Sequence, residues 1–199
     1  MGRYGVWGLA RGTGSRTGAA VARHLAEAGH SVVGIARNWR DASEQLPGLD
    51  RVEVDFQQVP PPPVDYVVQT IGKLDALVVT AGYGHPGVIW NLPRGDMDNM
   101  IWANLHLPAL ILQAAIHCTK HILLTASIAG VRQREGSSVY AGTKAGLIAM
   151  ADSARRELPD HVIQTISFDN VNAVGPKKVM GAYMFLLSTP GNIDVHLSR

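Results

Sequence analysis

Tyr140 and Lys144 are the two residues whose types and spacing could do acid–base chemistry. They stand four residues apart in the stretch Ser137-Ser-Val-Tyr140-Ala-Gly-Thr-Lys144, and on a helix this spacing places both side chains on one face. A free phenol has a pKa of about 10, and a nearby ammonium favours its ionised form. The pair could therefore act as a proton donor near neutral pH, although the same two residues also suit a solvated helix surface.

Two other residues lie where they could support such a donor. Ser127 follows a strand predicted over residues 121–126, and the carboxyl ends of strands are where parallel sheets collect catalytic groups. Asn104 stands four residues before Pro108 in a helix predicted over residues 96–117. Because proline has no N–H, the Asn104 carbonyl loses its helical partner. This frees a backbone acceptor, or it produces only a kink.

A glycine-rich stretch near the amino end could bind phosphate. A strand predicted over residues 4–10 leads into it, and a helix predicted over residues 19–28 follows it. Glycines let the backbone pass close to a pyrophosphate, and a helix N-terminus offers unpaired N–H groups and a positive dipole end. A tight structural turn would use the same residue types. The candidate residues are Gly12, Gly14, Ser15, Arg16, Thr17 and Gly18.

Arg37 and Asn38 stand at the end of a second strand, predicted over residues 30–36. About twenty residues after the glycine loop, dinucleotide folds that prefer NAD usually place an acidic residue on the ribose 2′-hydroxyl. Arg37 takes that place here, and together with Arg16 it would accept a 2′-phosphate. The sequence therefore favours NADP(H), with NAD(H) as the alternative, unless both arginines only cap the edge of the loop.

The remaining elements alternate between strands and helices. Further strands are predicted over residues 51–54, 74–80, 121–126, 162–167 and 193–195, and further helices over residues 64–71, 138–158 and 179–187. The prolines within residues 57–63 indicate a stiff connector. This alternation predicts an α/β fold, a Rossmann-type doubly wound parallel sheet of six to seven strands with helices on both faces. A chain of 199 residues is expected to form one domain, residues 1–199.

Composition limits the classes of partner. Apolar residues make up 46% of the chain, which suits a compact α/β protein with a large core. Eighteen basic and sixteen acidic side chains nearly cancel and form no basic tract, which argues against nucleic acid and membrane surfaces. Cys118 is the only cysteine and the start has no apolar signal core, so a cytoplasmic protein is expected. His117 and His121 straddle a helix-to-strand junction, and no metal is expected.

These residues together resemble the short-chain dehydrogenase/reductase family over nearly the whole chain. The interval of thirteen residues from Ser127 to Tyr140 matches the usual spacing of the serine and tyrosine of that family. Gly12 and Gly18 match the first and last glycines of its cofactor loop. The resemblance implies the same doubly wound fold and hydride transfer to or from a nicotinamide.

The resemblance also implies a role for each matching residue. Tyr140 would protonate the substrate oxygen or take its proton, and Lys144 would lower the pKa of Tyr140 and bind the nicotinamide ribose. Ser127 would hold the carbonyl oxygen, and the free carbonyl of Asn104 would hold a water in a proton relay to Lys144. Asp55 matches the acid that contacts adenine. Ala81 and Gly82, from the Asn-Ala-Gly motif of the family, would also contact the cofactor.

The chain departs from the family pattern at several positions that concern the cofactor and substrate. Arg16 replaces the middle glycine of the loop, and Thr80 replaces the asparagine of Asn-Ala-Gly. Phe168 and Asp169 stand in place of a Pro-Gly, and Ala173 stands where a threonine normally holds the nicotinamide amide. The segment that usually forms a substrate lid after the sixth strand is almost absent. These changes weaken the contacts to nicotinamide and leave the substrate pocket open.

The sequence thus predicts an NADP(H)-dependent oxidoreductase for a small carbonyl or alcohol substrate. The alternative is a protein of the same fold that binds NADP(H) as a sensor or interaction module without turnover. A homodimer or homotetramer is expected through the helices that carry Asn104 and Tyr140, because the second helix has a face of small residues. Those residues are Ala141, Gly142, Ala145, Gly146 and Ala149.

Overall fold

A seven-stranded, fully parallel sheet forms the centre of the computed structural model, which describes residues 1–8, 15–36, 49–55, 62–169 and 171–198. The strand order is β3-β2-β1-β4-β5-β6-β7. This confirms the predicted doubly wound α/β fold. The strands are β1 (Arg3–Trp7), β2 (Ser31–Ala36), β3 (Leu49–Glu53), β4 (Ala76–Val79), β5 (His121–Thr125), β6 (Val162–Phe168) and β7 (Asp194–Leu197).

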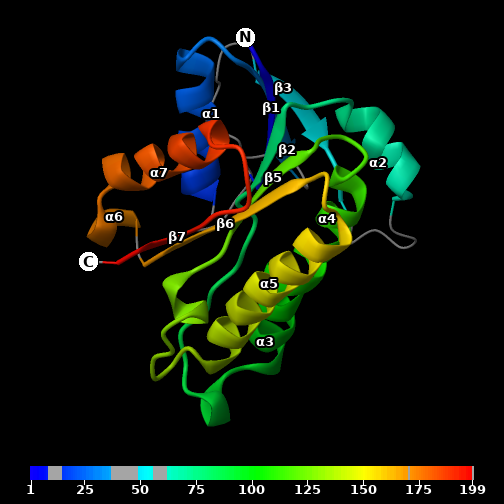
Figure 1. Cartoon of the computed structure of the whole chain (residues 1–199). Coiled ribbons are helices and arrows are strands. Elements are labelled where there is room, and N and C mark those ends of the chain that lie inside the picture. Colours follow the sequence, from blue (N-terminus) through cyan, green and yellow to red (C-terminus); the bar gives the residue numbers. More distant parts are fainter. Residues whose placement is uncertain (9–14, 37–48, 56–61, 170, 199) are drawn as a thin grey trace.

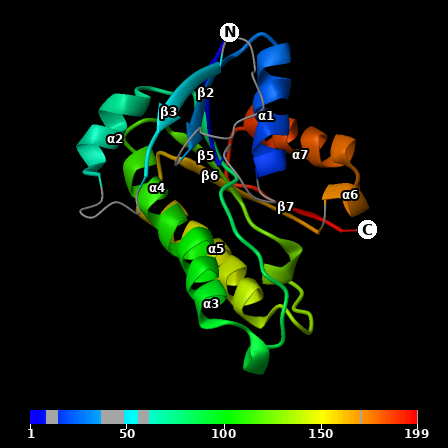
Figure 2. The same cartoon turned by 180° about the vertical axis from the view of Figure 1, so that it is seen from behind.

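Helices cover both faces of this sheet (Figure 1, and from behind Figure 2). The helices α1 (Ser15–Glu27) and α7 (Pro176–Ser188) pack on one face, where Val6, Val78 and Leu123 meet side chains such as Leu25 and Tyr183. The other face is covered by α2 (Val64–Ile71), α4 (Leu107–Ala115) and α5 (Ser138–Glu157). Since both faces are covered, the central strands are continuous apolar runs rather than alternating ones.

The helix predicted over residues 96–117 consists of three parts. It begins with α3 (Arg94–Ile101), widens into the π-helical segment η2 (Trp102–His106) and continues as α4 to Ala115. Pro108 lacks the N–H that an α-helix requires there, so the chain adopts the wider hydrogen-bonding pattern just before it. The predicted helix is therefore present, and its irregular part contains the fully buried Asn104.

The first strand is shorter than predicted. It ends at Trp7 rather than at residue 10, because Gly8 has a φ of +110°, which turns the chain out of the strand. The N–H of Gly8 still donates to the carbonyl of Ile35 at 2.9 Å. The helix that follows begins at Ser15, four residues earlier than predicted. Gly12 and Gly14 lie outside the described residues.

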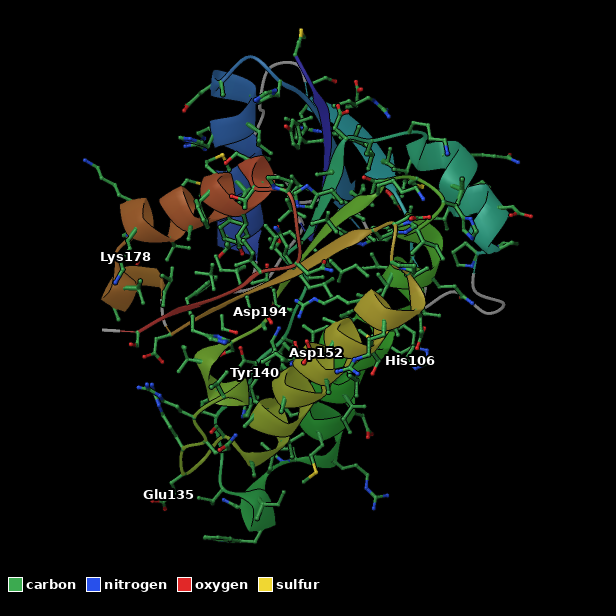
Figure 3. All side chains as sticks on the ribbon, viewed as in Figure 1. His106, Glu135, Tyr140, Asp152, Lys178 and Asp194 are labelled. Atoms are coloured by element: carbon green, nitrogen blue, oxygen red, sulfur yellow. The ribbon has the colours of Figure 1, made fainter. Side chains whose placement is uncertain are left out.

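An ion-pair cluster fastens the edge strand β7 to the rest of the fold. Arg155 on α5 donates from Nη1 and Nη2 to the carboxylate of Asp194, at 2.9 and 2.5 Å, and also from Nη1 to Asp152 at 2.6 Å. Figure 3 labels the two carboxylates. The hydroxyl of Thr165 on β6 donates to the same Asp194 carboxylate. Burial alone raises the pKa of Asp194, but these hydrogen bonds hold it below its ordinary value. The carboxylate is therefore ionised at neutral pH and links three elements.

Short helical elements follow β4, β5 and β6 in the part of the chain that the structure describes. The four-residue helix α6 (Val171–Val174) lies between β6 and α7, which agrees with the near absence of a lid in the sequence. Two short 3-10 helices that the sequence did not predict are η1 (Ile89–Asn91) and η3 (Ile128–Gly130). Across the described ranges of the chain, no helix has the length and apolar character needed to cross a membrane.

Candidate active site

The parallel sheet brings the candidate residues to one edge. Because all strands run in the same direction, the residues that follow β1, β4, β5 and β6 all lie at the carboxyl edge of the sheet. These include Gly8, Thr80, Ser127 and Asp169. The chain runs from β1 to β2 on one side and returns to β4 on the other, so the crevice between β1 and β4 is where such folds bind ligands.

Tyr140 lies in the first turn of α5 (Figure 3), and Ser127 follows β5 at the carboxyl edge of the sheet. Burial raises the pKa of the Tyr140 phenol, and a hydrogen bond with the Ser127 side chain offsets part of this shift. The oxygen of Ser127 also accepts a hydrogen bond from the N–H of Ala129 at 3.2 Å, which fixes the serine rotamer. The phenol is therefore protonated at neutral pH.

Lys144 is almost completely buried, with 4% of its surface exposed. Its Nζ donates to the carbonyl oxygen of Thr125 at 3.0 Å and lies 6.0 Å from the centre of the Tyr140 ring. Burial lowers the pKa of Lys144 to about 8. In this arrangement the pKa of Tyr140 is raised rather than lowered, because its own burial outweighs other effects. The charge of Lys144 was expected from the sequence to lower the pKa of Tyr140, and the structure does not show this net lowering.

The side chain of Asn104 binds the backbone of Tyr83, a contact that the sequence did not reveal. Its Oδ1 accepts from the N–H of Tyr83 at 2.9 Å, and its Nδ2 donates to the carbonyl of Tyr83 at 2.7 Å. The same Nδ2 donates to the hydroxyl of Thr143 at 3.2 Å. Asn104 thus joins the segment after β4 to the helix that carries Tyr140 and Lys144.

Gly82 lies beside two buried polar side chains, those of Asn104 and Lys144. A Cβ on Gly82 would stand 3.0 Å from Oδ1 of Asn104 and 3.4 Å from Nζ of Lys144. A side chain there would therefore push against the amide or the ammonium. The sequence identified Gly82 through the Asn-Ala-Gly motif of the family, and the structure shows which side chains occupy the space that a Cβ would need.

Thr125 is a functional residue that sequence reasoning missed. Its carbonyl accepts from Lys144, and its hydroxyl shares a hydrogen bond of 2.7 Å with the hydroxyl of Tyr183 on α7. Tyr183 is fully buried, and burial raises the pKa of its phenol above the ordinary value. Nothing in the sequence near Thr125 signals this link, because its partners come from two distant helices.

Glycines line the crevice between β1 and β4. A Cβ on Gly8 would stand 2.5 Å from the N of Ala81, and one on Gly18 would stand 2.6 Å from Oγ1 of Thr80. The Thr80 hydroxyl donates to the carbonyl of Trp7 at 3.0 Å, so the residue that replaces the family asparagine ties β4 to β1. These two glycines therefore let β1 and the first turn of α1 pack closely against the residues that follow β4, beside the crevice in which such folds bind dinucleotides.

Several cofactor candidates are only partly covered by the structure. Arg37 and Asn38 lie outside the described residues. Ser15 and Thr17 lie in the first turn of α1, and Arg16 lies between them. Asp55 follows β3, next to the end of β2, where the N–H of Val54 donates to the carbonyl of Ala36 at 2.9 Å.

Phe168 and Asp169, which replace the Pro-Gly of the family after β6, each contact another side chain. Arg134, from the stretch between η3 and α5, donates from Nη2 to Oδ1 of Asp169 at 2.5 Å. Phe168 packs edge-on against Tyr183, with ring centres 6.3 Å apart. Ala173 lies within α6. The residues that replace the family Pro-Gly therefore join the loop before Tyr140 to the end of β6.

No group of three or more His, Cys, Asp or Glu side chains that could hold a metal ion occurs among the residues that the structure describes. The ring Nε2 of His121 instead shares a hydrogen bond of 2.9 Å with Oε1 of Gln164, and Cys118 is buried.

Comparison with known proteins identifies the family. The family model described as short chain dehydrogenase matches residues 8–179, which is most of the chain. The chain belongs to this family. As a short-chain dehydrogenase/reductase it is an NAD(P)-dependent oxidoreductase, in agreement with the expectation from Ser127 and Tyr140.

Individual relatives of this short-chain dehydrogenase are distant. A protein of Danio rerio named carbonyl reductase family member 4 is 28% identical over 182 residues, which cover 86% of this chain and 73% of the relative. An uncharacterized oxidoreductase of Staphylococcus aureus (strain MW2) is 25% identical over 213 residues, which cover 93% of this chain and 92% of the relative. A crystal structure of a short chain dehydrogenase from Mycobacterium smegmatis has a TM-score of 0.81 at 22% identity. The match covers 100% of this chain and 92% of that one.

Replacement of Lys144 by Met is expected to stabilise the fold at pH 7. The folded state lowers the pKa of this lysine from 10.5 to about 8, so the unfolded state binds more protons between these values and the stability of the wild type rises with pH there. The advantage of Lys144→Met over the wild type should shrink by on the order of 2 kcal/mol between pH 7 and pH 9.5. Urea unfolding at both pH values measures it.

The exposed Lys120 provides the matched control. Lys120→Met should change stability equally little at both pH values. An advantage of Lys144→Met that is the same at pH 7 and pH 9.5 would show that burial does not shift the titration of Lys144.

Proposed function

We propose that this short-chain dehydrogenase transfers a hydride between NADP(H) and a small carbonyl or alcohol substrate, with Tyr140 as the general acid and base. The observation that carries the proposal is the place of Tyr140 in the first turn of α5 at the carboxyl edge of the sheet, near Ser127 and with Nζ of the buried Lys144 6.0 Å from the centre of its ring. We also propose that residues 1–199 form one dinucleotide-binding domain.

The chain supplies the proton and the position of the substrate. Because burial raises the pKa of Tyr140, its phenol carries a proton at neutral pH and can donate it to a carbonyl oxygen during reduction. Ser127 would hold the same oxygen through its hydroxyl, since its rotamer is fixed by the N–H of Ala129. The proton on Tyr140 would then be restored through a relay that consists of Lys144 and a water bound to the Asn104 carbonyl.

The cofactor supplies the hydride when it is bound. The residues that would hold it are the start of α1 with Thr17 and Gly18, the segment Ala81–Gly82 and Asp55, together with Gly12, Gly14, Ser15 and Arg16 of the glycine-rich stretch. Lys144 would bind the ribose. Arg37 and Asn38, with Arg16, would bind the 2′-phosphate, so NADP(H) is the proposed cofactor rather than NAD(H).

Tyr140→Phe is expected to lower kcat by a factor of roughly 10² to 10⁴, the usual contribution of a positioned acid. The variant removes one oxygen and keeps the ring against its neighbours. The measurement is NADPH oxidation against a panel of aldehydes, ketones and quinones.

Tyr66→Phe on the exposed face of α2 makes the same chemical change away from the site and should leave kcat unaltered. If wild-type protein binds NADPH tightly but turns over no member of the panel, the sensor interpretation is correct and the enzyme proposal is wrong.

Arg37→Ala is expected to weaken NADPH binding by about tenfold or more and to leave NADH binding nearly unchanged. The reason is that only NADPH carries the 2′-phosphate, and a charge-assisted hydrogen bond typically contributes 1.5–3 kcal/mol. Titration of each cofactor by fluorescence gives the two dissociation constants. An unchanged ratio of the two, or equal affinities in the wild type, would contradict the proposed preference.

We propose that the protein forms a homodimer or homotetramer through the helices that carry Asn104 and Tyr140. The first of these begins with α3, which lies beside α5 in both views (Figure 1 and Figure 2). Part of the small-residue face of α5 is used within the chain, because a Cβ on Gly146 would stand 3.2 Å from Leu105. Gly142 faces open space, and Ile101 on α3 is 48% exposed. These two residues support an interface with a second copy.

Light scattering at micromolar concentration should give a dimer or tetramer, and Gly142→Glu should shift it toward monomer. Gly181→Glu on α7 is the control, because a Cβ there also meets no atom within 4 Å. A wild-type monomer would contradict the proposed assembly.

A further inference from the structure

The segment Gly82–His85, after β4, forms a wall over the site. A Cβ on Gly84 would stand 3.3 Å from Cε2 of the Tyr140 ring, and Gly82 stands as close to Asn104 and Lys144. The backbone of this segment is therefore packed against the phenol and the ammonium with no side chain between them. Any movement of the segment changes the space beside Tyr140.

Tyr83, in the middle of the segment, is held at both its backbone and its side chain. Asn104 binds its N–H and its carbonyl, at 2.9 and 2.7 Å. The Tyr83 hydroxyl donates to Oδ1 of Asp96 at 2.6 Å. The first set of contacts comes from the buried irregular part of the long helix, and the second comes from the first turn of α3. Two separate points along one helix thus fix a single residue.

The contact with Asp96 is charge-assisted. The hydrogen bond to the carboxylate raises the pKa of the Tyr83 phenol above its ordinary value, so the hydroxyl remains a donor throughout the neutral range. Nδ1 of His85 lies 3.7 Å from the same oxygen of Asp96. Asp96 therefore faces polar groups on both sides of Gly84, the residue that touches the Tyr140 ring.

We propose that Asp96 and Tyr83 are positioning residues that hold the segment Gly82–His85 against Tyr140 and so set the substrate side of the site. This rests on the proposed function of Tyr140. Asp96 holds the hydroxyl of Tyr83, whereas Asn104 holds the backbone of the same residue. With the usual lid almost absent, this bonded segment is the wall that a substrate meets beside Tyr140.

Tyr83→Phe tests the proposal, since it removes the one oxygen that Asp96 binds and keeps the ring. Asp96 itself also places a negative charge in the first turn of α3, where it stabilises the helix, so its replacement would mix two effects. Tyr66→Phe on α2 is the matched control, because Tyr66 is 54% exposed and is remote in the sequence from the site.

Two readouts need no turnover. The first is the rate at which N-acetylimidazole acetylates the Tyr140 phenol, followed by peptide mass spectrometry. The second is hydrogen exchange of the backbone over residues 81–88. We expect Tyr83→Phe to raise both rates by roughly three- to tenfold, since a hydrogen bond to a charged group is lost at a partly exposed position. Tyr66→Phe should change neither rate.

Kinetics provides the readout that a purely structural role would not move. Tyr83→Phe should raise KM for the carbonyl substrate about threefold or more and raise KM for NADPH by less, because the lost bond frees the side chain of Tyr83 next to Gly84 and Tyr140, while Asn104 still holds the backbone beside Gly82. Equal acetylation and exchange rates in Tyr83→Phe and Tyr66→Phe would overturn the proposal, as would a rise in both KM values by the same factor. Faster acetylation of Tyr140 in a protein with no turnover would support the positioning role and contradict the proposed enzyme activity.

Discussion

The burial of one ammonium group is the constraint on which the site depends. Lys144 is 4% exposed, and burial lowers its pKa to about 8. Removing such a charge from water is costly unless hydrogen bonds offset the loss of hydration. The carbonyl of Thr125 supplies one such bond, and Thr125 is itself held by the hydroxyl of Tyr183. The helix that carries Lys144 also carries Tyr140, so the position of the ammonium and that of the phenol are fixed together.

The same constraint explains why backbone rather than side chains covers the site. Gly82 and Gly84 approach Asn104, Lys144 and the Tyr140 ring so closely that a Cβ at either position would stand within 3.4 Å of them. Bare backbone can exclude water from the lysine while leaving one side of the phenol open. The two polar anchors of Tyr83 then hold this backbone in place.

The parts of the site that were predictable from the sequence depend on local geometry. The spacing of Tyr140 and Lys144 reflects one turn of a helix, and Ser127 was found because it follows a strand of a parallel sheet. Pro108 likewise signalled the irregular helix around Asn104. These signals need no knowledge of distant contacts. The fold followed from the alternation of strands and helices for the same reason.

The parts that were missed depend on contacts between elements far apart in the chain. Thr125 acts through its carbonyl, which every residue has, and its partners lie on α5 and α7. Tyr83 is recognised through its backbone by Asn104, which is 21 residues away. The direction of the Tyr140 pKa shift was missed because it depends on burial. A sequence can indicate which two residues share a helix face, but it does not show how far the fold buries their side chains.

The strand order has a consequence for synthesis of the chain. β1 is made first, yet it ends in the middle of the sheet, between β2 and β4. Until β4 is made, one edge of this buried apolar strand has no partner, although Tyr4 must finally pair with Ala76. An unpaired hydrophobic edge is a template for the wrong strand of another molecule. A nascent chain that has passed β2 but not β4 is therefore the stage at which shielding by a chaperone would matter most.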